Sequence, residues 1–179
     1  MDSFPESELL DETTATKINE WIGETKKWKR RFSSSVDSLL PETFHSTVDN
    51  KGACIVLVES ENGSLFGGYS SVGFVNRGKN GLAYRDNHHF LFTLHNPWSI
   101  PPTMFKNKYP ETSLVYVDVY GPCFGSHSDF CLRGHDGHFS ESHVIGFPWS
   151  YVDTTGKGNK VFDGNESFSV KRMEVFTEM

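Results

Sequence analysis

The sequence predicts an α+β fold that is mainly β: a two-sheet antiparallel β-sandwich with short flanking helices, the main ones N-terminal. Helical periodicity comes first in the chain, and short strand-like segments separated by Gly and Pro turns follow it, an order typical of this class. The 15 Phe, 6 Tyr and 4 Trp residues supply flat side chains that fill the space between two sheets. A chain of 179 residues is expected to form one domain, residues 1–179.

The N-terminal part of the chain carries the helical pattern. Its apolar residues recur at spacings of three, four and seven between residues 7 and 32: Leu9, Leu10, Ile18, Trp21, Ile22, Trp28 and Phe32. Asp11, Thr13 or Thr14 is expected to cap the start, and Gly23 to divide the stretch into two helices or a helix and a turn. Residues 41–48 predict a short second helix that begins at Pro41. Residues 1–8 are expected to be a flexible lead-in.

The rest of the chain predicts strands, because apolar and β-branched residues alternate or run together between turn residues. The predicted strands are residues 53–60, 65–74, 88–94, 114–120, 129–134 and 167–176. Asn62-Gly63 favours a two-residue hairpin turn between the first two. Alternation breaks after Val170 in the last strand, which predicts a bulge at Lys171-Arg172.

Two adjacent glycines, Gly67 and Gly68, stand inside one of these predicted strands. A phosphate-binding loop would need its glycines between a strand and a helix, where backbone amides meet the phosphate. Here the pair follows a hairpin signal and continues into Tyr69, Val72 and Phe74. This context favours a bulge, or a place where another backbone or ring lies close.

Charge and cysteine content limit the possible functions. The net charge of −6 argues against general nucleic-acid binding, because phosphate binding needs a positive surface. The sequence has no apolar stretch long enough to cross a membrane, and its acidic first residues are unlike a signal peptide, so we expect a cytoplasmic protein with at most peripheral membrane association. Cys54, Cys123 and Cys131 are therefore expected to be free thiols.

Five stretches in this order resemble the TLDc domain family. They are KKWKRRFSSSVD (26–37), FHSTVDNKG (44–52), LFGGYSS (65–71), RDNHHFLFTL (85–94) and YGPCFGSHSDFCL (120–132), and the closing SFSVKRMEVF (167–176) fits the same family. The resemblance covers the chain from about Leu9 to its end. Where the family often has FGGGHD, residues 124–129 keep the Asp and move the His by one position.

The resemblance implies a β-sandwich flanked by short helices, a link to resistance against oxidative stress, and binding to the cytosolic sector of the vacuolar proton-pumping ATPase. It implies no catalytic activity and no cofactor, so we expect a non-enzymatic protein-interaction module. The oligomeric state stays open. The family motifs are expected to be structural at these positions: Gly67, Gly68, Asp86, Phe90, Phe92, Gly121 and Asp129.

Other chemistry stays open as an alternative. His135, His138 and Cys131 have a spacing that suits three zinc ligands, and the His-rich loop 127–143 offers a metal-dependent or Cys/His hydrolase site. Asp118 and Asp129, on successive predicted strands, could converge for glycoside hydrolysis or serve a sugar-binding sandwich.

Two further features suggest an interaction surface and a redox role. The basic cluster around Trp28 is either a solvated helix face or a docking patch for an acidic partner or anionic headgroups; it consists of Lys26, Lys27, Lys29, Arg30 and Arg31. Cys123, in a Gly-Pro turn near His127, is the better redox candidate, because Cys54 begins a buried type of strand.

Overall fold

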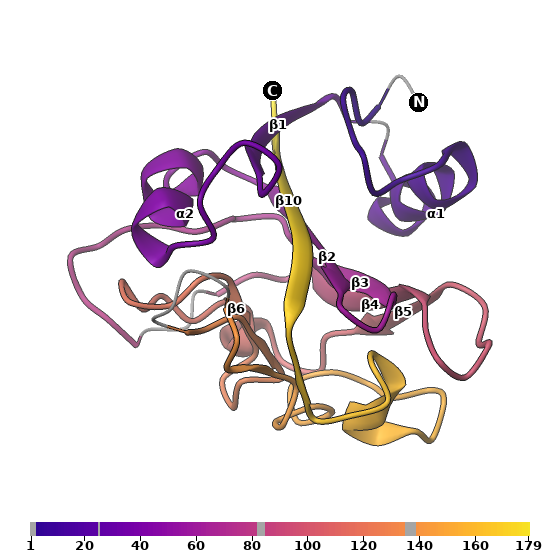
Figure 1. The fold of residues 1–179 in the computed structure, drawn as a ribbon. Helices are drawn as coiled ribbons and strands as arrows, with labels where there is room; N and C mark the ends of the chain where they lie inside the picture. Colours follow the sequence, from indigo (N-terminus) through magenta and orange to yellow (C-terminus); the bar gives the residue numbers. More distant parts are fainter. Residues whose placement is uncertain (1–2, 25, 82–84, 135–138) are drawn as a thin grey trace.

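The computed structural model confirms a mainly β fold with two antiparallel sheets (Figure 1). It describes residues 3–24, 26–81, 85–134 and 139–179. The larger sheet has the order β1-β10-β2-β3-β4-β5 and the smaller one β6-β7-β8-β9. The strands are β1 (Trp28–Ser33), β2 (Cys54–Ser60), β3 (Leu65–Ser70), β4 (His89–His95), β5 (Thr103–Lys106), β6 (Cys123–Phe124), β7 (Phe130–Cys131), β8 (Ser142–His143), β9 (Ser167–Phe168) and β10 (Val170–Glu178).

Two α-helices flank the larger sheet. The first, α1 (Glu12–Ile22), begins at Asp11, whose side chain accepts a hydrogen bond from the Thr14 amide in a capping box, and ends at Gly23 in the left-handed region. The second, α2 (Pro41–Val48), begins at Pro41, as predicted. Two single turns of 3-10 helix, η1 (Pro110–Thr112) and η2 (Gly158–Val161), lie in the connections. No helix in the described ranges is long and apolar enough to cross a membrane.

The second half of the predicted N-terminal helix is instead the edge strand β1. The register of β1 against β10 shifts between Arg30 and Phe32, so the strand carries a bulge. Trp28 therefore faces the outer side of the larger sheet, whereas Phe32 faces the space between the sheets. Trp28 and Phe32 are four residues apart and belong to different apolar layers because of the bulge. The same four-residue spacing is typical of a helix, so the sequence pattern did not distinguish the two.

Two apolar layers hold the structure together. Between the sheets, Phe66 of β3 packs against Phe130 and Phe168 of the smaller sheet, with ring centroids 6.0 and 5.0 Å away. On the outer face of the larger sheet, α1 and the N-terminal segment cover Ile55, Leu57 and their neighbours. β2 confirms the strand predicted at residues 53–60; it lies between β10 and β3 and is buried on both faces.

The predicted lead-in is wrong for residues 3–8. Phe4 is fully buried and stacks on Trp28 at 5.9 Å, with its edge toward Phe176 at 5.4 Å. The segment is thus part of the outer apolar layer. Its short sequence carries no periodicity, so only the packing of Phe4 reveals that it is anchored.

Three other local predictions have mixed outcomes. The bulge is confirmed, because the register of β10 against β2 shifts between Val170 and Arg172. The β2–β3 hairpin is confirmed, but its turn has three residues, with Ser60 and Ser64 paired around them and Gly63 left-handed.

Residues 114–120 form no strand: Leu114 makes one isolated bridge to Phe124, and a turn follows at Val117. Only Leu114 and Tyr116 face the core, which accounts for part of the alternation.

The structural interpretation of the glycine pair is confirmed. Both residues lie within β3, between β2 and β4. A Cβ atom on Gly67 would collide with the carbonyl oxygen of Val56, and one on Gly68 would lie 2.8 Å from the Phe124 ring. The first glycine lets two neighbouring strands approach, and the second lets the two sheets approach.

Candidate functional site around the Cys123–Cys131 disulfide

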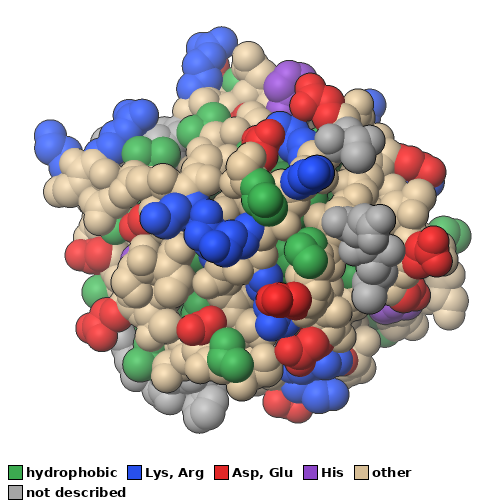
Figure 2. All heavy atoms as spheres, turned by 90° about the horizontal axis from the view of Figure 1, so that it is seen from above, with side chains coloured by type: hydrophobic (Ala, Val, Ile, Leu, Met, Phe, Trp, Pro, Cys, Tyr) green, Lys and Arg blue, Asp and Glu red, His purple; other side chains and the backbone are tan. Residues whose placement is uncertain are grey.

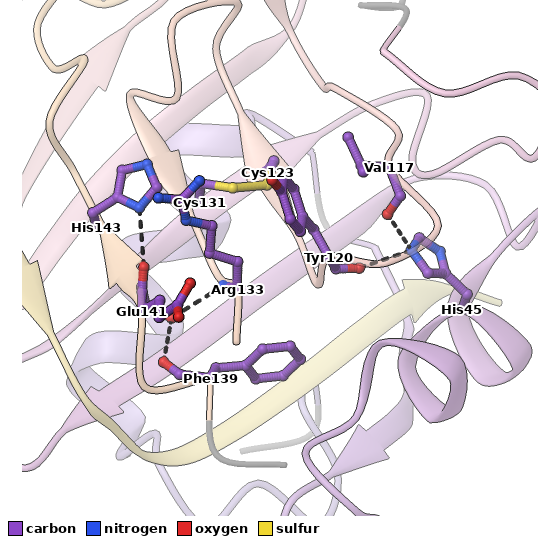
Figure 3. Close-up of a disulfide and its surroundings, with 10 residues drawn as sticks. His45, Val117, Tyr120, Cys123, Cys131, Arg133, Phe139, Glu141 and His143 are labelled. Carbon is purple, nitrogen blue, oxygen red and sulfur yellow. Dashed lines mark hydrogen bonds between the residues drawn. A yellow bond between two sulfur atoms is a disulfide. The ribbon is translucent and has the colours of Figure 1, made fainter. Parts of the chain in front are cut away.

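The smaller sheet brings two cysteines and a histidine into one row. Cys123 of β6 is paired with Cys131 of β7, which is paired in turn with His143 of β8. Directly paired residues of antiparallel strands place their side chains on the same face. The prediction of free thiols is wrong for this pair, because Cys123 and Cys131 form a disulfide in the structure (Figure 3). Cys54 is a free thiol whose pKa burial raises far above its usual range.

The groups beside the disulfide can move protons and stabilise negative charge. Burial lowers the pKa of His143, and the charge of the nearby Arg133 lowers it further. The Nδ1 atom of His143 is 3.1 Å from the Glu141 carbonyl oxygen. The Arg133 guanidinium lies 5.7 Å from the centroid of the Tyr120 ring (Figure 3). Once the disulfide is reduced, the neutral imidazole of His143 can accept a proton from a cysteine thiol, and the positive charge of Arg133 favours the resulting thiolate.

The disulfide is covered, although a redox-sensor cysteine must be reached from solvent. Both cysteines are at most 2% exposed. An oxidant or reductant therefore reaches the sulfur atoms only when the covering side chains move. Cys123 stays the redox candidate, now as half of a disulfide rather than as a free exposed thiol.

In the described part of the chain, the predicted zinc ligands do not form a metal site. His135 and His138 lie outside the described residues. Cys131, as half of a disulfide, offers no thiolate while that bond persists. Within the described ranges, no group of three or more His, Cys, Asp or Glu side chains is placed to hold a metal ion.

The other histidines and carboxylates of the alternative enzymatic sites have separate partners. His127 is exposed and packs against Trp149 with ring centroids 4.4 Å apart and the ring planes tilted, whereas His143 lies beside the disulfide. Asp118 is an exposed turn residue that accepts a hydrogen bond from the Asn80 side chain at 2.7 Å. Asp129 is fully buried in a bend before β7. The prediction that the two aspartates sit on successive strands is wrong.

Asp129 is an ionisable group with one unsatisfied oxygen. Its Oδ1 accepts a hydrogen bond from the Ser150 amide at 2.7 Å, and its Oδ2 has no hydrogen-bond partner within the described residues. Burial raises its pKa to about 6. Gly125 leaves room for this carboxyl group, because a Cβ there would collide with it. Asp129 thus joins the turn at residues 125–128 to the turn at residues 146–150.

Asp129→Asn is expected to change the pH dependence of stability. A carboxyl with a raised folded pKa contributes stability that is present below its unfolded value of 3.8 and is lost as pH rises to about 6. The interval between these values corresponds to roughly 3 kcal/mol. The variant, which carries no charge, should gain up to about that much relative to wild type between pH 4 and pH 8, measured by urea unfolding.

The control for this comparison is Asp118→Asn, which removes the same charge from an exposed position. Its stability profile should run parallel to that of the wild type. A parallel profile for Asp129→Asn as well would contradict the assignment of a buried carboxylate with a raised pKa.

The basic cluster lies on β1 and the two residues before it, and its side chains fall into two groups, paired and exposed. Lys26 Nζ is 2.9 Å from Glu178 Oε2, Arg30 Nη1 is 3.2 Å from Glu174 Oε1, and Arg31 Nε donates to Thr177 Oγ1 at 3.1 Å. Lys27 and Lys29 are exposed and form no ion pair within the described residues. The helix-face interpretation is therefore wrong. Figure 2, seen from above Figure 1, shows Lys and Arg side chains interspersed with Asp and Glu on this face.

A family model decides the identity of the fold. The model of the TLDc domain matches residues 3–178 of the chain. The chain belongs to the TLDc family. This membership makes it an oxidative-stress related domain at the level of the family. No curated protein matches the sequence.

The motif residues of this TLDc domain lie where structural residues are expected. Phe90 and Phe92 of β4 are buried beneath α1, and Trp21 packs against both. Asp86 accepts hydrogen bonds from the hydroxyls of Ser70 and Ser71 at 2.7 and 2.5 Å. Burial opposes ionisation of Asp86, but these and other donors together hold its pKa below the usual value.

Two further residues of the TLDc domain, Gly121 and Glu174, have structural roles. A Cβ on Gly121 would lie 2.8 Å from the Phe139 ring. Glu174 is 2% exposed and accepts hydrogen bonds from Ser7 Oγ, the Glu8 amide and Arg30. Sequence reasoning missed Glu174, because an acidic residue within an apolar strand gives no sign of the distant partners that surround it.

Proposed function

We propose that this TLDc domain is a cytoplasmic, non-enzymatic interaction module that binds the peripheral sector of the vacuolar proton-pumping ATPase and contributes to oxidative-stress protection. The observation that carries the proposal is the pair Lys27 and Lys29, whose ammonium groups are exposed and without ion-pair partners in the described chain. Family membership supports the choice of partner.

The position of these lysines suits recognition of an acidic surface. They belong to β1 and the residue before it, and β1 is fixed to β10 over its whole length, so the two charges are held on a rigid support. The chain as a whole carries a net charge of −6, so a local basic patch would orient it during encounter. Electrostatic complementarity of this kind raises the association rate and weakens with salt.

The test is binding of the isolated domain to the purified peripheral sector of the pump, measured by surface plasmon resonance. Lys27→Ser combined with Lys29→Ser should weaken binding about tenfold at low salt, mainly through the association rate. The matched control is Lys79→Ser combined with Lys160→Ser, which removes the same charge from two other exposed lysines. An equal loss in both variants would contradict a specific patch, and no binding by the wild type would overturn the proposal.

The link to oxidation is tested in the same assay. Binding is compared between protein with the Cys123–Cys131 bond intact and protein reduced with a dithiol, with free thiols counted in each sample. A difference in affinity between the two states would support a redox-dependent module. Equal affinity of the disulfide-bonded and reduced proteins for the pump would contradict a link between pump binding and the redox state of this bond.

A further inference from the structure

A cavity of about 280 Å³ lies between the end of α1 and the outer face of the larger sheet. Figure 1 shows α1 above the part of this sheet where β3, β4 and β5 lie. Trp21 and Ile22 of α1 form one wall, and Tyr69 and Phe90 form part of the sheet side. The volume is near the lower end of the range for small-molecule sites.

The interior of the cavity is aromatic and contains one available hydroxyl. The rings of Tyr69 and Phe90 have centroids 5.0 Å apart, and Trp21 presents its ring to Phe90 at 6.3 Å. Tyr69 is only 3% exposed, and its hydroxyl makes no hydrogen bond within the described part of the chain. Because Tyr69 lines the cavity, its hydroxyl is a donor that a bound ligand with an acceptor group can use.

The rim of the cavity carries hydrogen-bond donors and one full positive charge. Asn87, His88 and Asn107 surround the opening together with Lys106, the last residue of β5. Lys106 is exposed, and its ammonium group has no ion-pair or hydrogen-bond partner among the described residues. No Asp or Glu is among the described lining residues, and the neighbouring Asp86 is occupied by Ser70 and Ser71.

We propose that this cavity binds a small planar aromatic carboxylate, with its ring against Trp21 and Phe90 and its carboxylate at Lys106. Aromatic walls favour a flat apolar body through offset or edge-to-face contacts. A cation without a partner at the rim favours an anion, and hydrogen bonds to a charged group are stronger than neutral ones. The Tyr69 hydroxyl can donate to an acceptor inside the cavity. This site is independent of the basic patch on β1.

The probe for this site is 2-naphthoate, with 2-naphthamide as its uncharged counterpart. For a ligand of this size, an ordinary efficiency per atom gives a dissociation constant on the order of 1 mM or below. Titration is followed by the indole signals in ¹H–¹⁵N NMR spectra, and Trp21→Phe identifies the signal that should shift. The naphthoate should bind at least about fivefold more tightly than the amide, because only the carboxylate pairs with Lys106.

Two variants test the roles of the named groups. Lys106→Met should remove the preference for the carboxylate over the amide. Tyr69→Phe should leave the affinity for both probes nearly unchanged, because the ring of neither probe carries an acceptor for the Tyr69 hydroxyl inside the cavity. The control is Lys108→Met, because the Lys108 ammonium donates to the Pro148 carbonyl oxygen at 2.7 Å and is not part of the cavity. Thermal unfolding of each variant confirms that it is folded.

Several outcomes would overturn the proposal. A shift of other indole signals without that of Trp21 would place the probe elsewhere. Equal affinity for the acid and the amide, or unchanged selectivity in Lys106→Met, would remove the anion-binding role. An equal effect of Lys108→Met would show attraction to general positive charge rather than to this cavity.

Discussion

Gly67→Ala is expected to destabilise the protein by at least about 3 kcal/mol and to prevent folding if the fold has little stability to spare. The added methyl would collide with the carbonyl oxygen of Val56 on the neighbouring strand. Because that oxygen belongs to the backbone of the central strand β2, no side-chain rotation can relieve the contact. The change is measured as the free energy of unfolding in urea, or as loss of soluble monomer where the variant does not fold.

Gly68→Ala is the matched comparison, one residue away in the same strand. Its methyl would lie 2.8 Å from the Phe124 ring and 3.0 Å from a Leu91 methyl, both of which are side chains that can shift. We expect a smaller loss, about 1–3 kcal/mol. A larger loss at Gly68 than at Gly67 would contradict the explanation, because it would show that strand spacing is more adaptable than the core between the sheets.

Glu174→Ala is expected to cost about 3–5 kcal/mol and to release the N-terminal segment from the sheet. The carboxylate of Glu174 accepts hydrogen bonds from the Ser7 hydroxyl at 2.7 Å, the Glu8 amide at 2.8 Å and Arg30 at 3.2 Å. Its loss leaves a mostly buried guanidinium without its central partner. Once the segment detaches, Phe4 should lose its contact with Trp28, which hydrogen exchange and tryptophan fluorescence can follow.

Two other variants show whether burial accounts for the effect. Glu178→Ala removes a partly exposed ion pair with Lys26 and should cost less than about 1 kcal/mol. Glu174→Gln keeps an oxygen acceptor but no charge, so an intermediate loss is expected. If Glu174→Ala and Glu178→Ala cost the same, the buried hydrogen bonds of Glu174 do not anchor the N-terminal segment, and its anchoring has another source.

The sequence predicted the central features of the fold because they depend on local patterns. A β-branched run such as residues 53–60 belongs to a buried strand whatever its partners are, and Asp11 and Gly23 mark helix ends through backbone chemistry alone. The prediction failed where a bulge changed the period. Trp28 and Phe32 keep helical spacing in a strand, because the bulge turns the second of them to the other layer.

The candidate site was less predictable from the sequence, because the pairing register of β6, β7 and β8 brings its residues together. Cys123 and Cys131 are eight residues apart, and His143 follows twelve residues later. Spacing alone does not show that two short hairpin steps place all three side by side on one face. The basic cluster shows the same limit. Its composition is visible in the sequence, but only the structure shows that Arg30 forms an ion pair with the buried Glu174, whereas Lys27 and Lys29 have no ion pair among the described residues.

The position of β10 has a consequence for how the protein is made. β10 is the last described strand in chain order, yet it lies between β1 and β2 inside the larger sheet. During synthesis, the partner strand of β1 leaves the ribosome about 140 residues after β1 itself, and one edge of β2 stays unpaired until about 110 residues have followed it. Such distant pairing makes folding slow. The nascent chain therefore exposes two strand edges that can pair with other chains, and a chaperone that shields β2 until β10 arrives should raise the yield of native protein.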